Sequence, residues 1–250
     1  MKTALREYLL ALADDELILG HRASEWCGHA PILEEDIAFA NLALDEIGHA
    51  SLWYSVLAEI EEQDPAVYPD RLAYFREPQD FRNIQMVELP KGDWAFTIMR
   101  QYLFDAYEQV RLEALSQSGY EILAQVAMKI RQEEFYHYRH SSAWVRRLGA
   151  GTQESQRRMQ IALDELWAYT GQLFQPIAGE SELIQAGYVI ASENLKDKWQ
   201  DKVYPTLIES SLVIPATPQL HMNRQTHTHH LEVLLSEMQS VARLEAEANW

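Results

Sequence analysis

Apolar residues recur every three or four positions along most of this chain, and this spacing is the feature that most restricts its fold. Such a period places apolar side chains on one face of an α-helix. Alternating patterns typical of strands are nearly absent, and Gly occurs only 10 times in 250 residues. The pattern therefore predicts an all-α protein built from long amphipathic helices.

The longest periodic stretches predict two helical hairpins. Residues 3–26 and 32–62 would form the first hairpin, and residues 94–117 and 120–148 the second. The crossover 64–93 contains four prolines and several aromatic residues. Because a structureless loop of this length is unusual, we expect it to pack across the bundle and to be partly helical. Two long hairpins joined by a crossover predict a ferritin-like four-helix bundle.

The last hundred residues predict additions to this bundle. Further helices are expected over residues 153–174, 191–211 and 230–248. Pro205 should end or kink the second of these, because proline cannot donate the helical hydrogen bond. We expect a single ferritin-like domain over residues 1–250, with its bundle core at 3–148 and its appended helices at 153–250.

Two Glu-x-x-His motifs occur inside the predicted hairpins. Glu46 and His49 form the first motif, and Glu134 and His137 form the second. Residues three apart share one face of a helix, so each motif presents two possible metal ligands together. Both the glutamates and the histidines are separated by 88 residues, which indicates that the two hairpins are related copies.

A further acid lies opposite each motif in the expected hairpins. In antiparallel helices, residues at equal distances from the turn lie side by side. Glu46 follows the first turn by about 16 residues and Glu16 precedes it by about as many, on an apolar stripe. The same count across the turn near Gly119 leads from Glu134 to the neighbourhood of Asp105.

These positions match the ligands of carboxylate-bridged di-iron and di-manganese bundles. Buried polar groups of this kind are very unfavourable without a partner, and metal ions would neutralise them. The candidate metal ligands are Glu16, Glu46, His49, Asp105, Glu134 and His137. Asp105 is one methylene shorter than the glutamate expected there, which weakens it as a ligand. The alternative is a metal-free cluster satisfied by hydrogen bonds from Gln101, Tyr102 or Tyr138.

Other acids and histidines are less suited to a metal site. Glu108 and Glu133 are the alternate ligands if the helix register differs by one turn. Most of the acids flanking the site helices are expected to be solvated: Asp14, Asp15, Glu34 and Glu35. His21 and His29, near the first turn, are expected to cap or pack. His227, His229 and His230, at the start of the last helix, are expected to be solvated. Metal ligation is the alternative for both groups.

Charge and hydropathy restrict the partners of the chain. Asp and Glu number 38 against 21 Lys and Arg, a net charge of −17. Such a surface repels nucleic acid and anionic membranes, although it could dock a basic partner. No uncharged apolar stretch is long enough for a membrane span. Acids in the first twenty residues predict a helix rather than a secretion signal. The single Cys27 suits a reducing, cytoplasmic location.

Several segments resemble one known family, the C subunits of the bacterial phenylacetyl-CoA epoxidases. The resemblance covers nearly the whole chain. The segments that carry it are "SEWCGHAPILEEDIAFANLALDEIGHA", "VELPKGDWAFTIMRQYLFDAY", "HYRHSSAWVRRLGAGTQES" and "HTHHLEVLLSEMQSVARLEAEANW".

The resemblance implies a multicomponent oxygenase of phenylacetate degradation. In that complex a related catalytic A subunit holds the di-iron centre and epoxidises the aromatic ring. The C subunit pairs with A as a structural partner, a small B subunit bridges the assembly, and a reductase delivers electrons from NADPH. Members of the C family are regarded as non-catalytic, with incomplete ligand sets, whereas both Glu-x-x-His motifs are complete in this chain.

Two functions therefore remain open at the level of sequence. The first, which we favour, is a scaffold subunit of the epoxidase in a homo- or hetero-oligomer, with no resident cofactor required. The second is an oxygenase subunit in its own right, with two iron or manganese ions at the six candidate ligands. A ferritin-like metal store is disfavoured by the appended helices.

Overall fold

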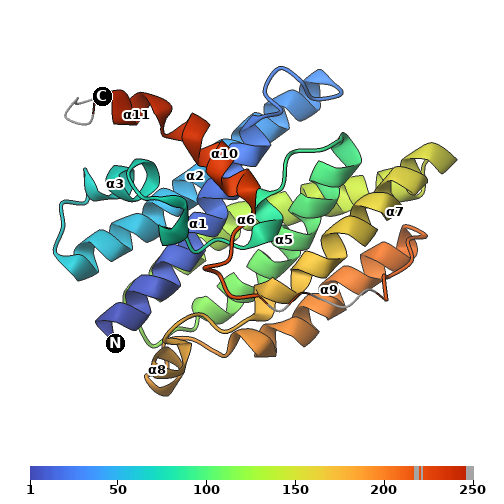
Figure 1. The fold of residues 1–250 in the computed structure, drawn as a ribbon. Coiled ribbons are helices and arrows are strands. Elements are labelled where there is room, and N and C mark those ends of the chain that lie inside the picture. The colour runs from blue at the N-terminus through green and yellow to red at the C-terminus, as the bar shows by residue number, and fades with distance from the viewer. Residues whose placement is uncertain (217–219, 221, 246–250) are drawn as a thin grey trace.

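Two long helical hairpins form the centre of the molecule. The computed structural model describes residues 1–216, 220 and 222–245, and all regular elements within these ranges are helices (Figure 1). The first hairpin consists of α1 (Lys2–Ser24) and α2 (Leu33–Glu61), and the second of α5 (Trp94–Leu115) and α6 (Glu121–Gly149). Each predicted boundary lies within two residues of the observed one. The predicted all-α, ferritin-like bundle is therefore confirmed.

The crossover between the hairpins is partly helical, as its sequence indicates. It contains α3 (Tyr68–Tyr74), a short 3₁₀ turn and α4 (Gln85–Glu88), and it packs on α1 and α2. Arg76 anchors it, because its guanidinium lies 2.5 Å from a carboxylate oxygen of Asp14 on α1. The Asp14 side chain also accepts hydrogen bonds from the Tyr54 hydroxyl and from the backbone N–H of Arg82.

The appended helices cover the second hairpin. α7 (Gln153–Trp167) packs on α5 and α6, and α9 (Lys196–Glu209) contacts the same two helices (Figure 1). The helix α9 continues past Pro205 for another turn, so the proline does not end it. Between them lie the shorter elements η2 (Ala168–Phe174), α8 (Glu180–Gln185) and η3 (Ser192–Leu195).

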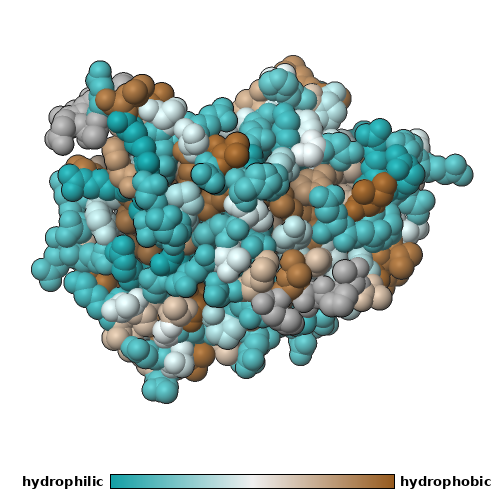
Figure 2. All heavy atoms as spheres, viewed as in Figure 1, coloured by the Kyte–Doolittle hydropathy of each residue, from teal (hydrophilic) through white to brown (hydrophobic). Residues whose placement is uncertain are grey.

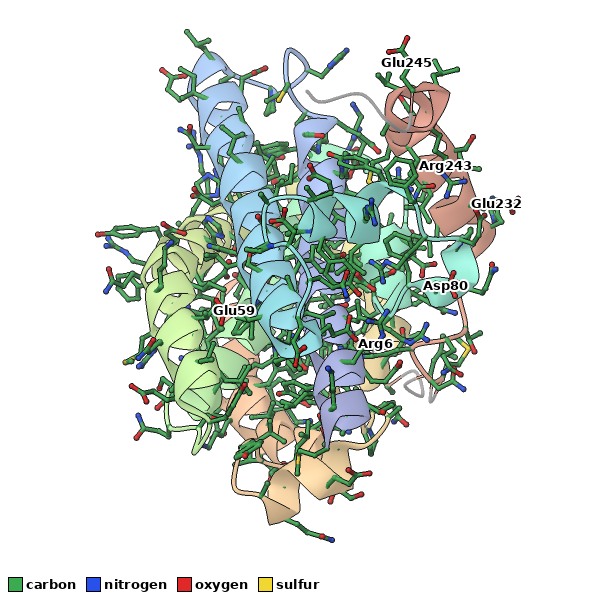
Figure 3. All side chains as sticks on the ribbon, turned by 90° about the vertical axis from the view of Figure 1, so that its left-hand side faces the viewer. Arg6, Glu59, Asp80, Glu232, Arg243 and Glu245 are labelled. Atoms are coloured by element: carbon green, nitrogen blue, oxygen red, sulfur yellow. The ribbon has the colours of Figure 1, made fainter. Side chains whose placement is uncertain are left out.

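The prediction of one final helix is wrong within the described residues. The chain forms α10 (His229–Met238) and α11 (Ser240–Leu244), which meet at Gln239. The Gln239 side-chain amide donates to the carbonyls of Ala73 and Arg76, and this contact ties the junction to the crossover. Figure 3 shows α11, with Arg243 labelled, beside the crossover on the side of α1 away from α6. The predicted helical residues 246–248 lie outside the described ranges.

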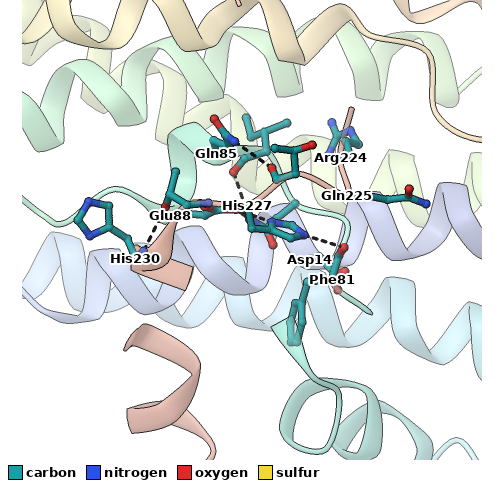
Figure 4. Close-up of polar contacts among 12 residues, drawn as sticks. Asp14, Phe81, Gln85, Glu88, Arg224, Gln225, His227 and His230 are labelled. Carbon is teal, nitrogen blue, oxygen red and sulfur yellow. Dashed lines mark hydrogen bonds and ion pairs between the residues drawn. The ribbon is translucent and has the colours of Figure 1, made fainter. Parts of the chain in front are cut away.

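A strap formed by residues 222–228 runs across the crossover and contacts α1 (Figure 4). The Arg224 guanidinium lies 2.8 and 2.9 Å from the two carboxylate oxygens of Asp15. The His227 ring lies between the Glu88 carboxylate, at 2.6 Å, and the Phe81 carbonyl, at 3.1 Å. His227 is therefore paired rather than freely solvated, which corrects the sequence-based expectation for this residue.

The expectation that the acids flanking the site helices are mostly solvated is also wrong. Asp14 and Asp15 are fully buried and Glu35 is 8 % exposed, whereas Glu34 is exposed. Asp14 and Asp15 are paired with arginines of the crossover, of α5 and of the strap. Glu35 lies 2.7 Å from His140 of α6. Buried acids such as Asp14 and Asp15 are tolerated because each has an arginine partner.

Buried apolar side chains from Ala4 to Leu235 form one contiguous core. A contiguous core is consistent with the single domain predicted for residues 1–250. The domain boundaries themselves stay a prediction. Within the described ranges, no helix combines the length and hydrophobicity needed to cross a membrane. The face that carries α3, α10, α7 and α9 is mostly hydrophilic, with apolar side chains scattered over it (Figure 2).

We expect Gly20 to be required for the close approach of α1 to α2. A Cβ atom at Gly20 would lie 3.0 Å from the Cβ atom of Glu46 and 3.0 Å from Cγ1 of Ile47. Gly20→Ala should therefore lower the free energy of unfolding by about 1–3 kcal/mol, measured by urea denaturation. The matched control is Gly48→Ala at an exposed position of α2, where an added Cβ meets no described atom within 4 Å. Gly48→Ala should raise the free energy of unfolding by about 0.5–1 kcal/mol, because alanine is favoured over glycine inside a helix. Equal effects of the two substitutions would contradict the account.

Candidate metal centre

The structure brings the six candidate ligands to the middle of the four central helices. Glu16 comes from α1, Asp105 from α5, and the two Glu-x-x-His pairs from α2 and α6. All six are between 0 and 5 % exposed: Glu16, Glu46, His49, Asp105, Glu134 and His137. The charges and dipoles of these side chains therefore interact with one another rather than with water.

Four of the six could hold a metal ion together. One potential ligand atom from each of Glu16, Glu46, His49 and Glu134 lies within 4.8 Å of the others. We call these four residues the first half-site. Both Glu16 oxygens, Oε2 of Glu46, Oε2 of Glu134 and Nδ1 of His49 have no hydrogen-bond partner in the described part of the chain. Buried acceptors without partners are rare, so these atoms need an explanation.

The other side of the cluster contains Asp105 and His137, and we call it the second half-site. Both Asp105 oxygens accept hydrogen bonds, one from the Gln101 amide at 2.7 Å and one from the Ser141 hydroxyl at 2.6 Å. The same Gln101 amide donates to Glu46 at 3.0 Å. His137 Nδ1 lies 2.9 Å from Glu134. Protein hydrogen bonds thus already satisfy Asp105 in the second half-site.

The metal-free alternative raised from the sequence is partly realised. Gln101 does satisfy acids of the cluster, as the sequence allowed. Tyr102 and Tyr138 do not, because their hydroxyls lie 3.4 Å from the backbone carbonyl of Lys202 on α9. The tyrosines therefore link the bundle to its appended helices rather than to the cluster.

Two partly exposed acids hold the outer nitrogens of the histidines. His49 Nε2 lies 2.7 Å from Glu133 on α6, and His137 Nε2 lies 3.2 Å from Asp45 on α2. Such outer contacts orient an imidazole so that its other nitrogen points inward. Asp45 is not among the residues predicted from the sequence, and Glu133 is among them only as an alternate ligand. Both acids immediately precede the motif glutamates and share the 88-residue offset, which was the available signal.

An arginine lies beside the first half-site. Arg111 Nη2 is 3.5 Å from a Glu16 oxygen and closer still to Glu108, while Nη1 is 3.3 Å from Asp15. Glu108, the other alternate ligand, is therefore paired with Arg111, although the charges of Glu16 and Glu134 also act on it. Burial raises the pKa of Glu108 well above its usual value, although the charge of Arg111 opposes this shift.

Burial and crowding shift the protonation of the cluster itself. Burial and the nearby Glu46 charge raise the pKa of Glu16 well above its usual value. Burial and the Glu134 charge do the same for the pKa of Asp105. Burial alone would also raise the pKa of Glu134, but the neighbouring His137 lowers it below its usual value. In the absence of a metal ion, protons held by these groups reduce the buried negative charge.

We expect the stability of the metal-free protein to fall at alkaline pH through His49. Burial lowers the pKa of His49, but the nearby carboxylate of Glu16, 3.8 Å from Nδ1, and the charges of Glu134 and Glu46 outweigh this effect and raise it to about 10. The stabilisation by the protonated ring is therefore complete below about pH 6.5 and is lost as the pH rises through about 10.

The measurement is the free energy of unfolding from pH 6 to pH 10 in a chelator. The decline should be shallower in His49→Gln than in the wild type. Exposed His29 provides the control, because His29→Gln should decline like the wild type. Equal slopes in His49→Gln and the wild type would contradict this role of His49.

Comparisons with known proteins identify the family of this chain. A family model described as "Phenylacetic acid catabolic protein" matches residues 1–250. The chain is also 36 % identical over 248 residues to the C subunit of the 1,2-phenylacetyl-CoA epoxidase of Escherichia coli strain K12. That similarity covers 98 % of this chain and 99 % of the relative. The chain therefore belongs to the phenylacetic acid catabolic protein family.

Proposed function

We propose that this chain is the non-catalytic, scaffold subunit of a phenylacetyl-CoA epoxidase that acts in phenylacetate degradation. The observation that carries the proposal is its end-to-end similarity to a C subunit of that enzyme, at 36 % identity. A subunit implies partners, and the partner we propose is the related catalytic A subunit. The small B subunit and the NADPH-dependent reductase complete the assembly, and we assign them no surface on this chain.

The state of the candidate metal centre supports a scaffold role. A di-iron centre supplies dioxygen activation when it is bound, and it needs free carboxylates around both metal positions. In this chain Asp105 is already held by Gln101 and Ser141. We therefore assign ring epoxidation to the catalytic A subunit.

An apolar surface on α2 and α6 supports docking to that subunit. These helices contact one another and carry six large, exposed apolar side chains, which we call the α2/α6 face: Leu33, Ile37, Leu44, Met128, Phe135 and Tyr136. Leu33, Ile37 and Leu44 follow a helical spacing along one side of α2. Leu33 and Leu44 are the most accessible to solvent, at 72 % and 68 %. Large exposed apolar side chains grouped on neighbouring helices are typical of protein interaction sites.

We expect charged substitutions on this face to weaken the complex with the catalytic subunit. Leu44→Asp and Phe135→Asp should each raise the dissociation constant at least about tenfold, because each would bury an unpaired charge. The measurement is isothermal titration calorimetry of the full chain with the purified catalytic subunit. The control is Val233→Asp on α10, which is 62 % exposed and lies outside the face. Equal weakening in the control, or none in either variant, would contradict the assignment of the face.

A second candidate function, oxygenase activity of this chain alone, is favoured by the unpartnered donors of the first half-site. The test is dioxygen consumption by the isolated, iron-loaded and reduced chain with phenylacetyl-CoA. The scaffold proposal predicts no turnover above that of iron in buffer, and full turnover only when the catalytic subunit is added. Product formation by the chain alone would replace the scaffold proposal.

A further inference from the structure

The unpartnered atoms of the cluster are concentrated in one place. Glu16, Glu46 and Glu134 together contribute four buried oxygens without hydrogen-bond partners among the described residues, and His49 contributes one nitrogen. These residues are 0–1 % exposed, so bulk water does not compensate for the missing contacts. They come from α1, α2 and α6, and their ligand atoms converge within 4.8 Å. A cation at this point would satisfy them together.

The second half-site differs because a hydrogen-bond donor already lies there. The Gln101 side chain is flanked by Glu46 and Asp105, both acceptors, so its NH₂ group must face them. The positive ends of these N–H bonds would repel a cation bridging the same two carboxylates. Ser141 fixes the other Asp105 oxygen, so that Asp105 cannot turn toward the cluster without losing this bond. The second half-site is therefore closed to a metal ion.

Arg111 is a further difference between the two half-sites, because it lies beside Glu16 of the first one. Its guanidinium supports the outer side of Glu16, at 3.5 Å, while it pairs mainly with Glu108 and Asp15. Three acids and one histidine are therefore available as ligands for a single divalent ion: Glu16, Glu46, Glu134 and His49. The outer nitrogen of His49 is held by Glu133, so that Nδ1 points into the half-site as a ligand.

We propose that this chain binds one divalent transition-metal ion, and not two, at Glu16, Glu46, His49 and Glu134. Three carboxylates and an imidazole are donors typical of Mn²⁺ or Fe²⁺, whereas Mg²⁺ and Ca²⁺ prefer oxygen ligands alone. The ion links α1 and α2 of the first hairpin to α6 of the second. Its role is to stabilise the folded bundle, because binding only the folded state shifts the equilibrium toward it. This inference does not depend on the scaffold role.

The test uses the metal-free full chain and Mn²⁺ as the probe. We expect one Mn²⁺ per chain by metal analysis after desalting, and the six-line electron paramagnetic resonance signal of an isolated ion. The melting temperature should rise with Mn²⁺ concentration. Two ions per chain, the spectrum of a coupled ion pair, or the absence of binding at millimolar Mn²⁺ would each overturn the proposal.

Two near-isosteric variants separate the half-sites. Glu16→Gln should weaken Mn²⁺ binding by roughly 100-fold, because it removes a charged ligand of the first half-site. Asp105→Asn is the control and should still bind one Mn²⁺ per chain, because Asp105 is held by Gln101 and Ser141 and is not one of the four ligands. Loss of binding in Asp105→Asn, or unchanged binding in Glu16→Gln, would overturn the assignment. The stoichiometry and the spectrum of the wild type test the proposal even if a variant does not fold.

Discussion

Burial of several carboxylates between two helical hairpins is the constraint on which the rest of this structure depends. Glu16, Glu46, Asp105 and Glu134 are all fully buried. An uncompensated charge in such a core is unfavourable by several kcal/mol, so each acid needs a proton, a hydrogen-bond donor or a cation. Asp105 has donors from neighbouring side chains, whereas the other three acids retain unpartnered oxygens among the described residues. Side-chain donors thus compensate the buried Asp105, whereas Glu16, Glu46 and Glu134 keep oxygens that a proton or a cation must compensate.

The two hairpins are related by an 88-residue offset that extends beyond the metal motifs. Asp45 and Glu133 occupy equivalent positions and hold the outer nitrogens of the opposite histidines. The symmetry breaks at Asp105, the shorter acid of the set. A subunit that works through its helical surface can tolerate this loss, because the bundle and the α2/α6 face persist without a complete dinuclear centre. We infer that the first half-site stabilises the folded bundle and takes no part in catalysis.

The sequence predicts well the features that depend on local periodicity. Helix limits followed from apolar spacing, and counting from each turn placed Glu16 and Asp105 near the motifs, because antiparallel helices rise equally per residue. The burial of Asp14 and Asp15 could not be predicted, since their arginine partners lie in the crossover, in α5 and in the strap, as much as 209 residues away. The sequence predicts hydrogen bonding by Gln101 as one alternative, but it does not distinguish one half-site from the other, because that difference depends on which acids the amide reaches.

The most direct test of this account is an anomalous-difference map from a crystal of the chain grown with Mn²⁺. The account predicts one peak, within coordination distance of Glu16, Glu46, His49 and Glu134. It also predicts that the Gln101 amide remains between Glu46 and Asp105, as in the present structure. A second peak beside Asp105 and His137, or no peak in the bundle at all, would contradict it.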